Sequence, residues 1–210
     1  MSTTLIYRLA LGFLGLLGLA LQILRDGPGM LLYYTILSNL LVTVFVFYLV
    51  YKEAKEGKLA GRQGIERAKG GVTMAILITF TIYHFMLSPL VTAEQYWNVR
   101  NFLVHYIVPL GFLADTLFWD SRKKYRWFDP LVWTLVPLAY SVFGVLNGLV
   151  LGLSVPHSPD SPFPYFFINV TKYGWVQVAQ NSAGIFVSYV VGGYALLLVK
   201  RYVGPRVSRP

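Results

Sequence analysis

The sequence predicts an all-α membrane protein, a bundle of six transmembrane helices with the N and C termini in the cytoplasm. Of its 210 residues, 56% are hydrophobic and 13% are charged, and the mean hydropathy is +0.56. That is more apolar surface than one soluble core of this size can bury. The apolar residues also gather into six long runs. Most of the basic residues lie in every second connection between these runs and in the C-terminal segment. These three observations exclude an ordinary soluble enzyme.

Each run is long enough for one crossing, because a hydrocarbon core of about 30 Å needs about 20 helical residues. We expect one polytopic domain over residues 1–210, with helices at residues 5–24, 30–51, 72–91, 102–119, 131–151 and 180–199. The first run lacks a cleavage site of small residues, so it is interpreted as a retained helix and not as a signal peptide. The connection at 154–179 is rich in proline and aromatic residues, which is typical of a cap at the membrane surface.

Basic residues set the expected orientation. Fifteen of the 18 Lys and Arg residues lie near the start of the first run (Arg8), in the second and fourth connections, or after the last run, leaving only Arg25, Arg100 and Lys172 on the other side. Positive charge collects in cytoplasmic loops, so this division places both termini in the cytoplasm. It also accounts for the net charge of +9, and we expect no nucleic-acid partner. Cysteine is absent, which excludes disulfides and thiolate chemistry.

Small residues recur every four positions in the last two runs. They are Gly144, Gly148 and Gly152, then Gly184, Ser188 and Gly192. Such spacing lets helix backbones approach closely in a membrane. We expect packing within the bundle, with a homodimer face as the alternative.

Polar residues inside the apolar runs converge at one depth near the expected outer surface. In the second run they lie at i, i+3, i+4 and i+8, on one helix face, and comprise Thr35, Ser38, Asn39 and Thr43. The third run brings Tyr83 and His84 to the same depth, and the fourth brings Asn101 and His105. Polar groups are costly in hydrocarbon, so they are functional candidates. The alternative is structural, with hydroxyls bonded to the preceding turn and each histidine neutral within the bundle.

A hydroxyl beside an imidazole is the minimal acyl-transfer pair, because an alcohol attacks an ester only when a base removes its proton. Depth alone does not choose between Thr35 and Ser38 as nucleophile, or between His105 and His84 as base. Donors for an oxyanion could come from Ser38, Asn39, Tyr83 or Asn101. Asp115 lies about 15 Å from His105 along a helix, too far to orient it. We expect Asp115 to pair with a basic residue of the inner loops, such as Arg122.

Ordered sequence pieces resemble the family of androgen-induced and androgen-dependent TFPI-regulating proteins, particularly its bacterial six-helix branch. The pieces are residues 34–41, 83–84, 105–109, 113–118, 137–140 and 163–166, and they cover most of the chain. The resemblance implies an intramembrane threonine hydrolase of fatty acid esters of hydroxy fatty acids or similar lipid esters. It implies Thr35 as nucleophile and His105 as base. From their depth, we expect Ser38, Asn39, Tyr83, His84 and Asn101 to bind substrate or support the oxyanion.

The hydrolase that we expect is an integral protein of the bacterial inner membrane, with its site toward the outer side and no cofactor. Two other classes stay open. Three imidazoles and a water make a catalytic zinc site, and His84, His105 and His157 are all expected on the outer side. Alternatively, the polar residues of the second run, Thr35, Ser38, Asn39 and Thr43, contact a lipid headgroup. The protein would then bind or transport lipids without catalysis.

Overall fold

The computed structural model describes residues 2–158 and 161–206, and within these ranges the chain is all-helical. Six of its helices are long and apolar enough to cross a membrane, which confirms the predicted six-helix class. Their bounds are Thr3–Asp26, Tyr34–Glu56, Gln63–Leu90, Val99–Trp119, Asp129–Leu151 and Val170–Val199. Pro159 of the expected cap and Arg209 of the basic tail lie outside the described residues.

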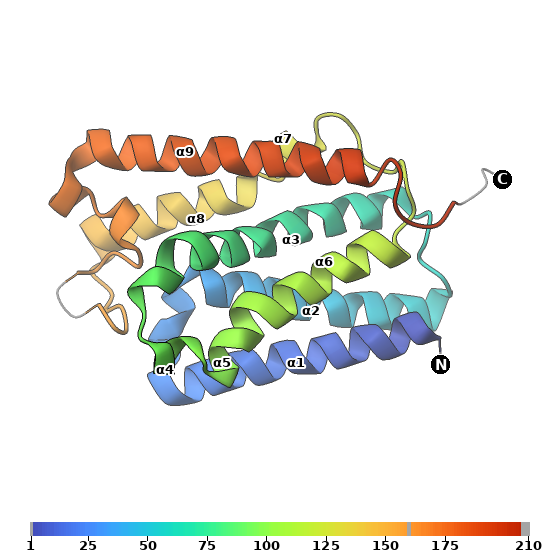
Figure 1. The fold of residues 1–210 in the computed structure, drawn as a ribbon, viewed down its shortest axis with the longest axis horizontal. Helices are drawn as coiled ribbons and strands as arrows, with labels where there is room; N and C mark the ends of the chain where they lie inside the picture. Colours follow the sequence, from blue (N-terminus) through green and yellow to red (C-terminus); the bar gives the residue numbers. More distant parts are fainter. Residues whose placement is uncertain (1, 159–160, 207–210) are drawn as a thin grey trace.

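Successive spans run in alternating directions along the bundle (Figure 1). We call the end where α1 (Thr3–Asp26) begins and α9 (Val170–Val199) finishes the terminal end. The other end, where residues 152–169 connect to α9, is the loop end. It also carries the start of α2 (Tyr34–Glu56) and the short helix α4 (Ala93–Tyr96).

Four spans surround the main apolar core. These spans are α1, α2, α3 (Gln63–Ile82) and the span formed by α5 (Val99–Phe102), a π-helical turn (Leu103–Ile107) and α6 (Val108–Trp119). Their buried side chains include Leu11, Val46, Ile76, Val108 and Phe112. The remaining two spans lie against this group and expose many large apolar side chains, as expected of helices that face lipid. They are α9 and the span formed by α7 (Asp129–Val132), α8 (Leu135–Leu146) and a π-helical turn (Asn147–Leu151).

Three helix starts differ from the predicted bounds by four residues or more. The second helix begins at Tyr34, because Pro28–Leu32 forms a 3₁₀ turn and Tyr33 is extended. The third begins at Gln63, nine residues before the expected start at 72. The sixth begins at Val170, ten residues before the expected start at 180, but Gly174 interrupts it with a non-helical φ of 75° and ψ of 161°. The cap between the last two spans is correspondingly shorter than predicted. Helices continue past the apolar run wherever their polar residues find partners or water, and hydropathy alone does not detect that extension.

The glycines of the fifth span, Gly144 in α8 and Gly148 in the π-helical turn that follows it, pack against the chain's own loop. A Cβ added at Gly148 would overlap the Phe163 ring, and one at Gly144 would lie 2.6 Å from Ile168 Cδ1. A Cβ at Gly184 of α9 would meet nothing within 4 Å. The close approach that these residues permit therefore seats residues 163–168 on α8.

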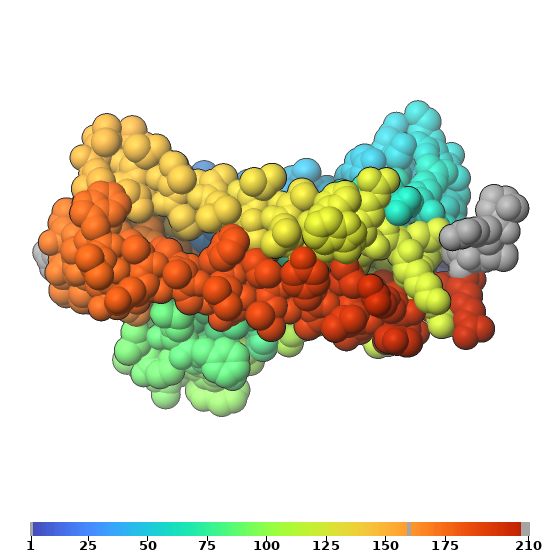
Figure 2. Space-filling view, turned by 90° about the horizontal axis from the view of Figure 1, so that it is seen from above, coloured from blue at the N-terminus to red at the C-terminus, as the bar shows by residue number. Residues whose placement is uncertain are grey.

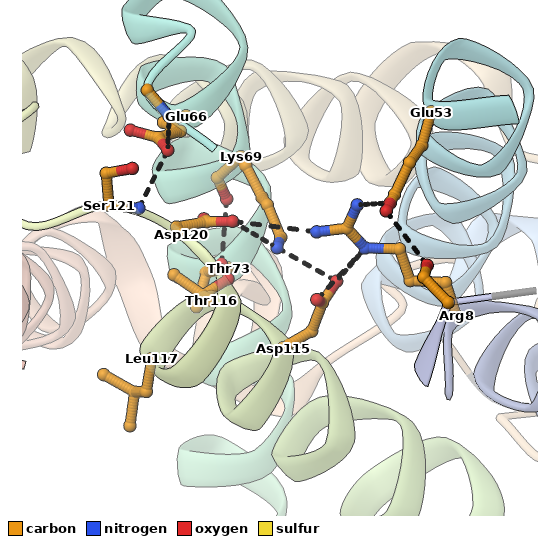
Figure 3. A network of polar contacts seen from close by, with 12 residues as sticks. Arg8, Glu53, Glu66, Lys69, Thr73, Asp115, Thr116, Leu117, Asp120 and Ser121 are labelled. Carbon is orange, nitrogen blue, oxygen red and sulfur yellow. Dashed lines mark hydrogen bonds and ion pairs between the residues drawn. The ribbon is translucent and has the colours of Figure 1, made fainter. Parts of the chain in front are cut away.

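Buried charges join α1, α2, α3 and α6 near the terminal end (Figure 3). The Asp115 carboxylate lies 3.1 Å from Arg8 Nε and 2.9 Å from Lys69 Nζ. Lys69 belongs to an expected inner connection, so pairing with a basic residue of the inner loops is confirmed, but Arg122 as the partner is wrong. Arg8 also binds Glu53 at 2.8 Å, and Lys69 binds Asp120 at 2.7 Å. All five side chains are almost inaccessible to solvent. Buried charges persist only when paired, so this network ties the four helices together.

The expected partner of Asp115 is occupied elsewhere. Arg122 Nε donates instead to the Gly204 carbonyl at 3.1 Å. Burial raises the pKa of Asp120 to about 6, and the ammonium of Lys69 opposes that rise. Helix assembly thus brings in Arg8 and Lys69, which are distant from Asp115 in the sequence.

Candidate active site

Thr35 is the second residue of α2, at the loop end. Because Tyr33 is extended, the helix has no preceding turn to bond the Thr35 N–H. His105 comes from the π-helical turn Leu103–Ile107, a geometry that often occurs at functional sites. The Thr35 Oγ1 atom lies 3.5 Å from His105 Nε2. The structure thus brings the expected hydroxyl and imidazole to the outer limit of hydrogen bonding.

The imidazole of His105 is held from its far side. Its Nδ1 lies 2.7 Å from Asn101 Oδ1 and 3.2 Å from the Asn101 backbone oxygen. A backbone carbonyl only accepts, so Nδ1 carries the proton and the Nε2 lone pair faces Thr35. The ring also stacks on Tyr83 with centroids 3.7 Å apart. Asn101 and Tyr83 therefore orient the imidazole.

A tyrosine from the loop completes the surroundings of Thr35. The Thr35 N–H donates to the Tyr165 hydroxyl at 3.3 Å, and this hydroxyl lies 3.5 Å from Thr35 Oγ1. Burial raises the pKa of Tyr165, so the phenol stays protonated at neutral pH. Helical periodicity could not find this residue, because it lies in a loop. The only sequence signal was its place in the piece at 163–166.

Ser38 and Asn39 support the first turn of α2. The Asn39 amide donates to the carbonyls of Thr35 at 2.7 Å and Val104 at 2.9 Å. The Ser38 hydroxyl donates to the Thr35 carbonyl at 3.1 Å and pairs with Thr79 Oγ1 at 2.7 Å. These bonds fix Thr35 relative to neighbouring helices and engage the donors that the sequence suggested for an oxyanion.

The other two histidines lie apart from Thr35. His84 is exposed, and its Nδ1 lies 3.1 Å from the Tyr106 hydroxyl. His157 Nε2 lies 3.3 Å from the Asp26 carboxylate. Within residues 2–158 and 161–206, no group of three or more His, Cys, Asp or Glu residues could hold a metal ion. The geometry therefore does not assemble the tri-histidine site.

Thr35 lines a cavity of about 120 Å³. Its walls come from α2, α3, α8, α9 and the loop, and its described lining residues carry apolar, hydroxyl and phenol groups without a charged side chain. Representative members are Ile82, Leu138, Tyr165, Ile185 and Phe186. Figure 2 shows α8 and α9 lying side by side on this face of the molecule. The cavity suits an uncharged, mainly apolar group next to the threonine hydroxyl.

The chain matches no family model, no curated protein and no solved structure. The geometry of the site itself therefore defines its class: a partly buried hydroxyl, an imidazole whose Nε2 lies 3.5 Å from it, and an apolar cavity.

Proposed function

We propose that this protein is an intramembrane hydrolase of lipid esters, with Thr35 as nucleophile and His105 as general base. The observation that carries the proposal is the approach of Thr35 Oγ1 to the unprotonated Nε2 of His105, at 3.5 Å. Hydrogen bonds between base and nucleophile are often long before substrate binds. The apolar cavity and the resemblance to the threonine hydrolase family add support.

The proposed reaction has two steps. Thr35 Oγ1 attacks the ester carbonyl carbon while its proton moves to His105 Nε2, and the imidazolium then protonates the departing alcohol oxygen. The acyl group stays on Thr35 as an ester. Water next gives a proton to His105 and attacks this ester, which releases the fatty acid and restores the threonine hydroxyl. The cycle needs no cofactor.

Charge on the carbonyl oxygen needs donors, and we assign this role to the Thr35 N–H and the Tyr165 hydroxyl. Both groups flank the nucleophile, and they bond each other when no substrate is present. A substrate oxygen between them would accept from both. The Thr35 N–H would then exchange its bond to the Tyr165 oxygen for one to the substrate oxygen.

The substrate class follows from the cavity and the resemblance. We propose fatty acid esters of hydroxy fatty acids or similar lipid esters, whose acyl chains would enter from the bilayer between α8 and α9. We further propose that both termini lie in the cytoplasm of a bacterial inner membrane and that the site faces the outer side; the division of basic residues supports this orientation. The glycine spacing of α9 leaves a homodimer as a further proposal.

The decisive experiment measures hydrolysis of a long-chain acyl ester by the purified protein in detergent. We expect Thr35→Ala and His105→Ala each to lower kcat/KM by about 10³-fold or more, and the double variant to be little worse than either, because the pair acts as one unit. Thr35→Ser should keep part of the activity. A fluorophosphonate should label Thr35 in the wild type and neither alanine variant.

Matched controls are Thr81→Ala and His157→Ala. Thr81 lies on an exposed part of α3 with its hydroxyl bonded to the Leu77 carbonyl at 2.9 Å, and His157 is an exposed histidine. Both should keep the wild-type rate, and so should protein treated with a chelator. Folded Thr35→Ala and His105→Ala variants that hydrolyse at the wild-type rate would overturn the mechanism. Lipid binding without turnover in the wild type would favour the binding or transport function.

A further inference from the structure

A second cavity lies at the terminal end, far along the bundle from Thr35. Its volume is about 410 Å³, and its described lining residues are Lys123, Tyr125, Leu197, Lys200, Arg201 and Tyr202. Half of these side chains are cations and none is an acid. The cavity lies between the segment that follows α6 and the end of α9.

Backbone hydrogen bonds join the two walls of this cavity. The Lys123 N–H donates to the Lys200 carbonyl at 2.9 Å, and the Arg122 N–H donates to the Pro205 carbonyl at 3.2 Å. Arg122 Nε adds a bond to the Gly204 carbonyl. These bonds hold the backbone that carries the cationic side chains in place before a ligand binds, which lowers the entropic cost of binding.

Lys200 is a buried member of this wall, with 2% of its surface exposed. Its ammonium donates to the Asp120 carbonyl at 2.7 Å and the Leu117 carbonyl at 3.3 Å. An ammonium has three N–H donors. Two are used by these neutral carbonyls, which hold Lys200 in the wall of the cavity.

Lys123 has a strained backbone, with φ of 61°. This left-handed region favours glycine, and a lysine there is uncommon. Such strain often occurs at functional sites, where the position of the side chain matters more than local stability. The strain gives an observation independent of the cavity and its charge.

Acidic residues near this wall are engaged elsewhere. The Asp120 carboxylate binds Lys69, and Glu66 Oε1 accepts from the backbone N–H groups of Gly61 and Ser121. Among the described residues, no acid forms an ion pair with Lys123 or Arg201, and none lines the cavity. Asp120 and Glu66 still act on the Lys200 ammonium through space, so Lys123 and Arg201 carry the part of the positive charge that has no ion-pair partner among the described residues.

We propose that this cavity binds the phosphate group of an anionic membrane lipid. Arg201 would supply a fork of parallel N–H donors, while Lys123 and Lys200 would supply ammonium donors. The cavity lies where α9 ends, beside Tyr202, whose side chain is exposed and suits the interface of a bilayer. Basic pockets at the cytoplasmic ends of membrane helices bind anionic headgroups in this manner.

The test uses the full chain in detergent and follows two readouts, lipid retained in native mass spectrometry and the thermal unfolding midpoint. The probes are phosphatidylglycerol, phosphatidylcholine and inorganic phosphate, added separately. The test variant is Lys123→Gly with Arg201→Gln, in which glycine also relieves the backbone strain. The matched control is Lys124→Gln with Arg126→Gln. It removes two positive charges from the same segment as Lys123, and neither side chain lines the cavity.

We expect phosphatidylglycerol, but not phosphatidylcholine, to be retained and to raise the midpoint of the wild type. Its affinity should fall about 10-fold or more in the test variant and stay within about two-fold in the control. Equal losses in both variants would show a general charge effect and overturn the site. Stabilisation by inorganic phosphate without stabilisation by phosphatidylglycerol would assign the cavity to free phosphate and overturn the lipid proposal.

Discussion

The position of Thr35 at the start of α2 gives one residue two chemical groups at the site. Its hydroxyl faces the His105 lone pair, and its N–H is one of the donors that a helix leaves without an internal partner. Ser38 and Asn39 bond the Thr35 carbonyl and so fix the direction of that first turn. On this face of α2, Thr35 therefore takes part in the proposed reaction, whereas Ser38 and Asn39 hold Thr35 in position.

The Tyr165 hydroxyl provides the sharpest residue-scale prediction. Tyr165→Phe removes one oxygen and keeps the ring, so we expect kcat to fall about 10²- to 10³-fold with a small change in KM. Tyr33→Phe is the matched control, because its ring packs against Tyr165 with centroids 5.6 Å apart and its hydroxyl bonds the Pro156 carbonyl. The measurement is steady-state hydrolysis of one acyl ester.

A thionoester separates an oxyanion role from a structural one. Sulfur in place of the carbonyl oxygen is a poorer acceptor, so the wild type should strongly prefer the oxygen ester, and Tyr165→Phe should reduce this preference. An unchanged preference together with an unchanged kcat would remove Tyr165 from the mechanism, even if Thr35 and His105 are essential.

At the scale of elements, hydropathy predicted that six helices exist but misplaced where some begin. The predicted third helix began after Lys69 because charged residues interrupt the apolar run. The structure continues α3 back to Gln63, since Lys69 and Glu66 are buried with ionic and backbone partners from other segments. Those partners depend on tertiary structure, which a local pattern does not contain.

The same reasoning applies to the site. Thr35 and His105 lie on helices, so their depth could be estimated from rise per residue, and the structure brings them together. Tyr165 lies in a loop whose path depends on how Phe163 and Ile168 pack on the glycines of α8. No periodicity predicts that path.

Gly148 gives a prediction for the contact between α8 and the loop. A methyl group there would overlap the Phe163 ring, so Gly148→Ala should lower the free energy of unfolding by about 1–3 kcal/mol. It should also lower activity, because the same loop carries Tyr165. Gly184→Ala is the control: it meets open space in a helix and should be neutral or stabilising by up to about 1 kcal/mol. Thermal unfolding in detergent checks both, and equal midpoints would contradict the packing argument.

At the scale of the whole molecule, the two ends differ in charge and in chemistry. The terminal end holds the buried ion pairs and the cationic cavity, whereas the loop end holds Thr35 and its apolar cavity. The terminal end, which holds the cationic cavity, is also the end to which the sequence assigns most of the Lys and Arg residues.

Orientation in the membrane can be measured directly. Because 15 of the 18 basic residues belong to the connections and segments assigned to one side, a reporter fused after Pro210 should give a cytoplasmic signal, and one inserted near Pro159 an external signal. The reverse pattern would place Thr35 toward the cytoplasm and contradict the proposed outer-leaflet site. Insertion at 159 should be checked for retained folding.

The buried ion pairs also have a consequence for the order of biosynthesis. Arg8 and Glu53 belong to the first two helices, so this pair can form as soon as the first hairpin emerges from the ribosome. Lys69 belongs to the third helix, but its partners Asp115 and Asp120 are translated much later, at the end of the fourth span. Lys69 lies about two turns into α3, so leaving it unpaired costs less than the roughly 2.5–3.5 kcal/mol that insertion scales give for a lysine at the centre of a membrane helix. The third helix should therefore keep the segment around Lys69 at the aqueous surface until the fourth span arrives, and only then complete its insertion.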